Sequence, residues 1–139
     1  MTDFFRKVSE ATKAMRSLFP ETPLQENVYL SQKYGARVFL KREDLSPVRS
    51  YKIRGAFNTM RHALTFNPSI KKFACASAGN HAQGVAFACR YFNVKGYIFM
   101  PVTTPQQKID KTQAFGGKNI EIELTGDYFD TTLLSLIHI

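Results

Sequence analysis

From residue 52 onward, short apolar stretches alternate with amphipathic stretches at a regular interval, and this repeat constrains the fold more than any other feature. Apolar stretches centred near Phe73, Ile98 and Ile122 predict strands at 73–77, 96–100 and 119–124, one every 24–25 residues. The apolar spacing between them predicts helices at 52–64, 80–92 and 105–115. Such a repeat indicates an α/β fold with a parallel sheet flanked by helices and right-handed crossovers. The last stretch alternates strictly, which is typical of a half-exposed strand or an edge strand.

The first 50 residues and the last 14 show weaker patterns. Residues 4–19 predict an amphipathic helix that ends at Pro20 and carries one apolar stripe: Phe4, Val8, Ala11, Met15 and Leu18. A strand is expected at 37–41, followed by a loop in which Pro47 excludes a helix. Residues 126–130 have the pattern of a helix start with Asp127 as its cap. The apolar tail 131–139 is interpreted as the end of a truncated reading frame, with a genuine short tail as the alternative.

Composition and charge restrict the classes of partner. The formal net charge is +8, but the basic residues occur singly or in pairs, so we expect no nucleic-acid partner. Cys75 and Cys89 both lie in apolar stretches and do not form a C-x-x-C pair, which favours free thiols in a reducing cytoplasm over a disulfide or a metal site. No stretch has the roughly 20 apolar residues that span a bilayer, so no membrane partner is expected.

Ligands of parallel α/β sheets bind at the carboxyl ends of strands, which directs attention to residues 77–84, SAGNHAQG. Small residues there let the backbone approach a ligand closely, and the following helix N-terminus attracts a carboxylate or phosphate. Asn80 would add a side-chain donor. Ser77 and Asn80 are equally common as turn and cap residues that need no ligand. His81 has no second ligand at metal spacing, which favours a loop role over metal binding.

A second segment, SYKIRGA (50–56), places Lys52 at the start of a predicted helix. A cation there opposes the helix dipole, and together with desolvation this favours the neutral amine that attacks carbonyl groups. A solvated surface lysine explains the same pattern without any chemistry.

Taken together, SYKIRGA (50–56) and SAGNHAQGVA (77–86) resemble the fold-type II pyridoxal-phosphate enzymes, and threonine dehydratases in particular. Three further segments support the resemblance: TPL (22–24), FLKREDLSPVRS (39–50) and MPVTTPQQK (100–108). The resemblance extends over nearly the whole chain, to about Asp130. It implies deamination of L-threonine to 2-oxobutanoate and ammonia, the first step of isoleucine biosynthesis.

The resemblance assigns a role to each candidate residue. Lys52 would carry pyridoxal 5′-phosphate covalently and move the substrate's α-proton, Tyr51 would pack near the cofactor, and Asn80 would bond its ring hydroxyl. The substrate carboxylate would be held by the loop Ser77, Ala78, Gly79, Asn80 and His81. Serine dehydration and serine racemisation by the same family remain alternatives, as does a non-catalytic fragment or basic binding module.

The resemblance also predicts the domain organisation. Residues 1–50 would begin the large domain, and 51–139 would form an incomplete small α/β domain. The glycine-rich loop for the cofactor phosphate, the residue facing the pyridine nitrogen and a regulatory domain are expected beyond residue 139. A polypeptide of these residues alone is therefore expected to have little deaminase activity. The family is usually oligomeric, so a homo-oligomer is expected at full length.

Overall fold

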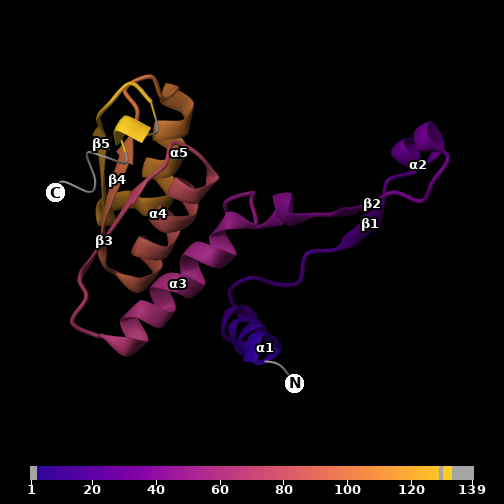
Figure 1. Cartoon of the computed structure of the whole chain (residues 1–139), viewed down its shortest axis with the longest axis horizontal. Coiled ribbons are helices and arrows are strands. Elements are labelled where there is room, and N and C mark those ends of the chain that lie inside the picture. Colours follow the sequence, from indigo (N-terminus) through magenta and orange to yellow (C-terminus); the bar gives the residue numbers. More distant parts are fainter. Residues whose placement is uncertain (1–2, 129, 133–139) are drawn as a thin grey trace. The chain divides into compact units, whose positions relative to one another are not determined.

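The structure is a computed structural model that describes residues 3–128 and 130–132. Contacts within the chain define two compact units, Met1–Tyr51 and Lys52–Ile139. Figure 1 labels the elements of both units. None of the described helices is long and apolar enough to span a membrane.

The first unit contains two helices and a small antiparallel ribbon. Its elements are α1 (Asp3–Met15), β1 (Leu24–Glu26), α2 (Val28–Tyr34), β2 (Phe39–Lys41) and a 3-10 turn at Glu43–Leu45. In the ribbon, Leu24 pairs with Lys41 and Glu26 with Phe39. Asn27 caps α2, because its side chain accepts a hydrogen bond from the Leu30 amide (2.8 Å), and Gly35 ends the helix with φ 60°.

The predicted first helix is correct in position but ends earlier than expected. Helix α1 stops at Met15 rather than continuing to residue 19, because the amides of Leu18 and Phe19 both turn back to the Met15 carbonyl. Phe4 and Val8 of the expected apolar stripe are exposed, whereas Met15 is buried. Ion pairs between residues three and four apart join Arg6 to Asp3 and Glu10 along this helix.

The second unit is the predicted α/β repeat. Its elements are α3 (Lys52–Phe66), β3 (Lys72–Ala76), α4 (Asn80–Phe92), β4 (Lys95–Met100), α5 (Gln106–Gly116), a 3-10 turn at Gly117–Asn119 and β5 (Ile120–Leu124). The three strands are parallel in the order β3-β4-β5, with Cys75 opposite Ile98 and Ile98 opposite Ile122. The expected strand direction and the edge position of β5 are therefore confirmed. Each predicted boundary in this unit lies within two residues of the observed one.

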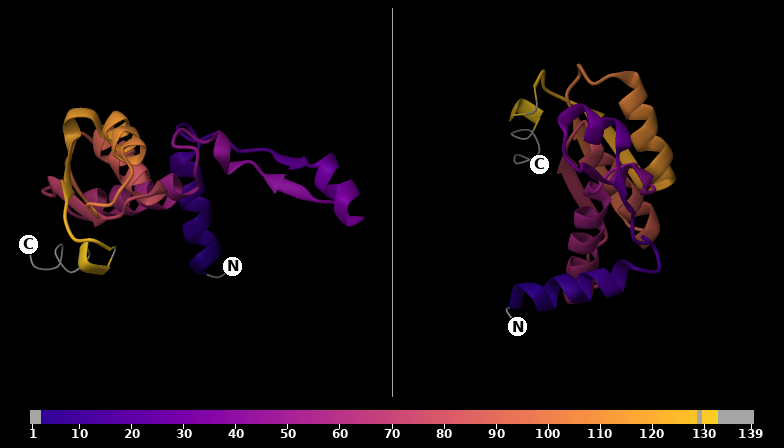
Figure 2. Two further views of the ribbon diagram at one scale, coloured as in Figure 1. Left: turned by 90° about the horizontal axis from the view of Figure 1, so that it is seen from above. Right: turned by 90° about the vertical axis from the view of Figure 1, so that its right-hand side faces the viewer.

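Helices α4 and α5 cover one face of the sheet, as two views show (Figures 1 and 2). Helix α4 contacts all three strands, and α3 packs on α4. The alternate residues Gly96, Ile98 and Met100 of the central strand are buried. A Cβ atom at Gly96 would lie 2.6 Å from Cys89 Sγ, so this face of β4 lies against α4. The core of the unit is thus formed between the sheet and α4.

The turn after β5 leads into a helical turn, as expected. Residues 130–132 are helical, and the Thr132 amide donates to the Tyr128 carbonyl (3.1 Å). The Thr131 hydroxyl oxygen accepts a hydrogen bond from the Tyr128 amide (3.2 Å) at this start, and the capping role of Asp127 stays a prediction. The remainder of the expected tail, residues 133–139, lies outside the described residues.

Candidate active site

The loop between β3 and α4 holds the first set of candidate residues at the carboxyl end of the sheet. Strand β3 ends at Ala76, and the Ser77 amide still donates to the Phe99 carbonyl of β4 (2.9 Å). This bond fastens the loop to the central strand. Ser77, Ala78 and Gly79 are half-buried, whereas Asn80 and His81, the first residues of α4, are exposed.

The start of α4 is arranged to receive an anion. Gly79 occupies the cap position and offers no side chain to the first-turn amides. The Ser77 hydroxyl oxygen accepts from the Gly79 amide (3.3 Å), which shapes the loop one residue ahead of the helix. Amides of a first helical turn have no partner within the helix, and the helix dipole favours negative charge beside them. A carboxylate fits this position.

Lys52 is the first residue of α3, and the packing of α3 on α4 brings it near that loop. A Cβ atom at Gly84, in the second turn of α4, would lie 3.1 Å from Ile53 Cα and 3.3 Å from the Lys52 carbonyl oxygen. The start of α3 therefore lies directly against the first turns of α4. Lys52 is exposed, so the desolvation expected from the sequence is not provided by the described residues.

Lys52 lies close enough to His81 for its positive charge to affect the pKa of His81. Two causes lower the pKa of His81 below its usual value: partial burial and, second, the positive charge of Lys52. Both act against the charged imidazolium. The neutral imidazole that they favour is able to accept or donate a hydrogen bond at the mouth of the loop.

A hollow of about 170 Å³ borders the same loop. It is lined by residues from α3, β3 and α4: Gly55, Ala56, Thr59, Met60, Phe73, Ala74, Cys75, His81 and Val85. His81 is the one candidate residue among them. Burial raises the pKa of the Cys75 thiol to about 12, so this thiol is a weak nucleophile at neutral pH.

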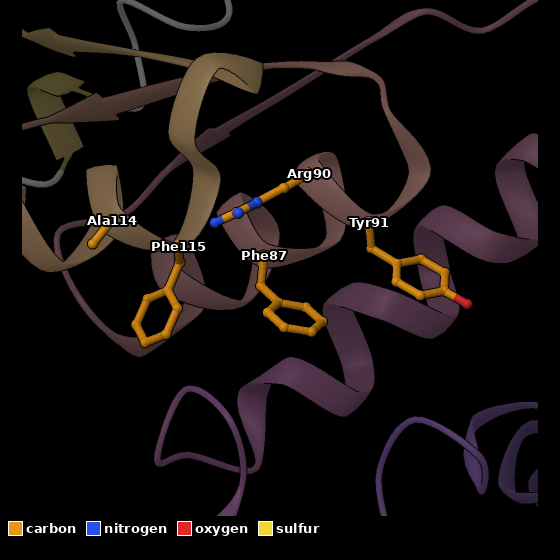
Figure 3. Close-up of a pocket in the computed structure, with 5 residues that line it drawn as sticks. All are labelled: Phe87, Arg90, Tyr91, Ala114 and Phe115. Atoms are coloured by element: carbon orange, nitrogen blue, oxygen red, sulfur yellow. The ribbon is translucent and has the colours of Figure 1, made fainter.

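A larger hollow of about 360 Å³ lies elsewhere, between α4 and α5. Figure 3 shows its lining side chains, Phe87, Arg90, Tyr91, Ala114 and Phe115. None of them is a candidate residue, and the Tyr91 phenol is the only acid or nucleophile among these five side chains. Size alone is thus a poor guide here, and the chemistry of the side chains places the candidate site at the carboxyl end of β3.

Most of the candidate residues belong to the second unit. Lys52 and the loop from Ser77 to His81 come near one another there, because α3 packs on α4 at Gly84. Tyr51 is the last residue of the other unit and is exposed. Within the described residues, no group of three or more His, Cys, Asp or Glu side chains is placed to hold a metal ion.

Two buried residues of the second unit were not singled out from the sequence. Small residues in 77–84 were expected to admit a ligand, but Gly84 instead admits another helix, as a glycine inside a helical pattern often does. Thr104, in the loop after β4, has a buried hydroxyl without a hydrogen-bond partner among the described residues. Nothing in the sequence around Thr104 indicates that its hydroxyl is buried.

Comparison with known proteins gives a consistent result. The model of the family described as "Pyridoxal-phosphate dependent enzyme" matches residues 16–136. The chain is 50% identical over 133 residues to the biosynthetic L-threonine dehydratase of Staphylococcus epidermidis, which covers 96% of this chain and 31% of the relative. The Staphylococcus aureus enzyme of the same name is 50% identical over 128 residues (92% and 30%). The chain thus spans about a third of the length of the curated relatives it matches.

Solved structures show the same similarity. Threonine deaminase isoform 2 of Solanum lycopersicum is 39% identical with a TM-score of 0.79, over 94% of this chain and 35% of that protein. A pyridoxal 5′-phosphate-dependent aspartate racemase is 25% identical with a TM-score of 0.88, over 96% of this chain and 41% of that protein. The fold is therefore shared between deaminating and racemising enzymes.

Proposed function

Because the chain belongs to the family of pyridoxal-phosphate-dependent enzymes, we propose that it forms the lysine-bearing part of a threonine dehydratase. The whole enzyme deaminates L-threonine to 2-oxobutanoate and ammonia, the first step of isoleucine biosynthesis. The 50% identity to biosynthetic dehydratases supports threonine as the substrate. The packing at Gly84, which seats the start of α3 against the first turns of α4, is the observation that carries the proposal.

The residues present fit the cofactor's needs. Lys52 offers an exposed primary amine, and the half-buried Ala78 and Gly79 leave the loop beside it narrow enough for close backbone approach. Lys52 would hold the cofactor and later move the α-proton of the substrate, for which a primary amine is suited. When bound, the cofactor supplies an electron sink for the charge left on the α-carbon. Asn80 and Tyr51 would orient the ring.

The loop from Ser77 to His81 would hold the substrate carboxylate on the first-turn amides of α4. This contact orients the α-carbon toward the Lys52 amine, and such orientation contributes a large part of many rate enhancements. The neutral imidazole favoured at His81 adds a hydrogen-bonding group without adding a second positive charge beside Lys52.

The two units correspond to parts of two domains in this proposal. Residues 1–50 begin a large domain, and 51–139 form most of a small α/β domain. The full-length enzyme would be a cytoplasmic homo-oligomer, and the two free, buried thiols of Cys75 and Cys89 suit a reducing compartment.

A chimeric enzyme tests the proposal. Residues 1–130 would replace the matching segment of the S. epidermidis dehydratase, which supplies the remaining two thirds of the chain. We expect a folded chimera that releases 2-oxobutanoate from threonine faster than pyruvate from serine, and loses both activities with Lys52→Ala. A folded chimera that prefers serine, racemises it, or keeps its activity without Lys52 would contradict the proposal.

A further inference from the structure

Gly84 lies outside the loop that would contact the substrate, yet it controls how closely two functional segments approach. We infer that Gly84 is a positioning residue: its missing side chain seats α4 on the backbone of Lys52 and Ile53, and so sets the separation between the Lys52 amine and the 77–81 loop. This inference rests on the proposed role of Lys52 for its catalytic meaning, although the contact itself does not.

The contact is unusually close and consists of backbone on both sides. A Cβ atom at Gly84 would meet Ile53 Cα at 3.1 Å, Ile53 N at 3.3 Å and the Lys52 carbonyl oxygen at 3.3 Å. Unstrained carbon contacts lie at roughly 3.5–4.0 Å. No side chain is available to rotate out of the way, so an added methyl group must displace one helix backbone relative to the other.

The displacement would fall on the start of α3. The residues of α4 that flank Gly84 are packed in the core, with Ala82 and Ala86 at 0% exposure and Val85 at 6%. Further along, Phe57 of α3 is held between Tyr91 and Phe92 of α4, at centroid distances of 5.0 and 4.7 Å. In the first turn of α3, Ile53 is fully buried against Gly84 whereas Lys52 is exposed, so a shift of the Ile53 backbone would carry Lys52 with it.

Gly55 provides a matched comparison. It is also a glycine inside a helix of this unit, but a Cβ atom there would meet nothing within 4 Å. Gly55→Ala and Gly84→Ala share the same gain in helix propensity, about 0.5–1 kcal/mol. They differ in the helix displacement that Gly84→Ala alone requires.

The distance between Lys52 and α4 can be monitored without any cofactor by measuring the pKa of His81. Because the charge of Lys52 lowers the pKa of His81, Lys52→Met should raise that pKa. The size of the rise reports the distance between the two side chains. His81 is followed by NMR titration and identified among the three histidines by His81→Gln.

The test measures this rise in four backgrounds: the native chain, Gly55→Ala, Gly84→Ala and Gly84→Val. We expect an equal rise in the first two and a smaller rise with each step in size at Gly84. A rise in Gly84→Val as large as in the native chain would overturn the inference. In the native chain, a nuclear Overhauser contact should join a Gly84 α-proton to the Ile53 amide; its absence would overturn the inference even if Gly84→Val fails to fold.

A second readout connects the contact to the proposed function. Borohydride trapping of pyridoxal phosphate on Lys52 should be slower in Gly84→Val, by up to about 100-fold if the amine is misplaced by about 1 Å, and unchanged in Gly55→Ala. Unchanged trapping in a folded Gly84→Val variant would also overturn the inference. If the native chain shows no preference for Lys52 while the His81 titrations behave as expected, the proposed function fails and the positioning contact stands.

Discussion

Gly96 in the central strand β4 has no room for a methyl group, and this makes the packing of sheet on helix open to a quantitative test. A Cβ atom there would lie 2.6 Å from Cys89 Sγ and 3.1 Å from Ile120 Cγ2. The first distance is about 1 Å shorter than a relaxed contact of roughly 3.5–4.0 Å. Cys89 has 0% exposure, so its side chain cannot turn toward solvent.

Gly96→Ala should therefore destabilise the chain. Overpacking of a dense core costs about 1–3 kcal/mol, against a gain of about 0.5–1 kcal/mol from replacing glycine inside a strand. The 2.6 Å contact puts the cost in the upper part of that range, about 2–3 kcal/mol, so the net loss should be about 1–2.5 kcal/mol. Adding Cys89→Ala removes the sulfur at 2.6 Å, so the double variant should regain much of this loss although Cys89→Ala alone creates a cavity.

Urea denaturation of the four chains, followed by far-UV circular dichroism, measures the coupling between Gly96 and Cys89. Equal stability of the native and Gly96→Ala chains would show that the sheet does not lie against α4 as the structure has it. A strictly additive double variant would refute the reasoning about Cys89 in particular. Gly55→Ala serves as the control, because its methyl group meets open space and should stabilise α3.

Three further results are expected. Thr104→Val should leave the free energy of unfolding unchanged or raise it by about 1 kcal/mol, because the buried Thr104 hydroxyl has no hydrogen-bond partner among the described residues. Thr112→Val should lower it by about 1 kcal/mol, because the Thr112 hydroxyl donates a hydrogen bond to the Lys108 carbonyl (2.9 Å). The midpoints of urea denaturation measure both effects. Burial raises the pKa values of Cys75 and Cys89 to about 12 and about 11, from 9.0. The folded state thus keeps these protons longer than the unfolded state, so stability should fall as the pH rises above 9, and less so in the double alanine variant. A polypeptide of these 139 residues should show little threonine turnover beside a full-length relative, and comparable turnover in a coupled assay would contradict that expectation.

The sequence predicted the second unit well because its pattern is long and regular. Strands near Phe73, Ile98 and Ile122 and the helices between them lie where hydrophobic periodicity placed them. Short elements of the first unit were missed: β1 has three residues, too few to show alternation, and α2 has seven. Their local signals were present, since Asn27 caps α2 and Gly35 ends it.

For the site, the sequence identified the two segments but did not show that they pack close together. Lys52 and the 77–81 loop are separated by a helix and a strand, and no local pattern states that α3 packs on α4 at Gly84. The effect of the Lys52 charge on the pKa of His81 follows from the same packing, so it could not be predicted from the sequence either. Roles of individual residues toward the cofactor stay predictions, because they rest on resemblance.

Reductive trapping tests the central claim, that Lys52 is the cofactor-bearing lysine, most directly. The chain would be incubated with pyridoxal phosphate, reduced with borohydride, digested, and the modified lysines mapped by mass spectrometry, with Lys52→Ala as the control. We expect the label to be concentrated on Lys52, in preference to other exposed lysines such as Lys33 and Lys118, and to be lost in the alanine variant. Label spread over the lysines without preference for Lys52 would contradict it.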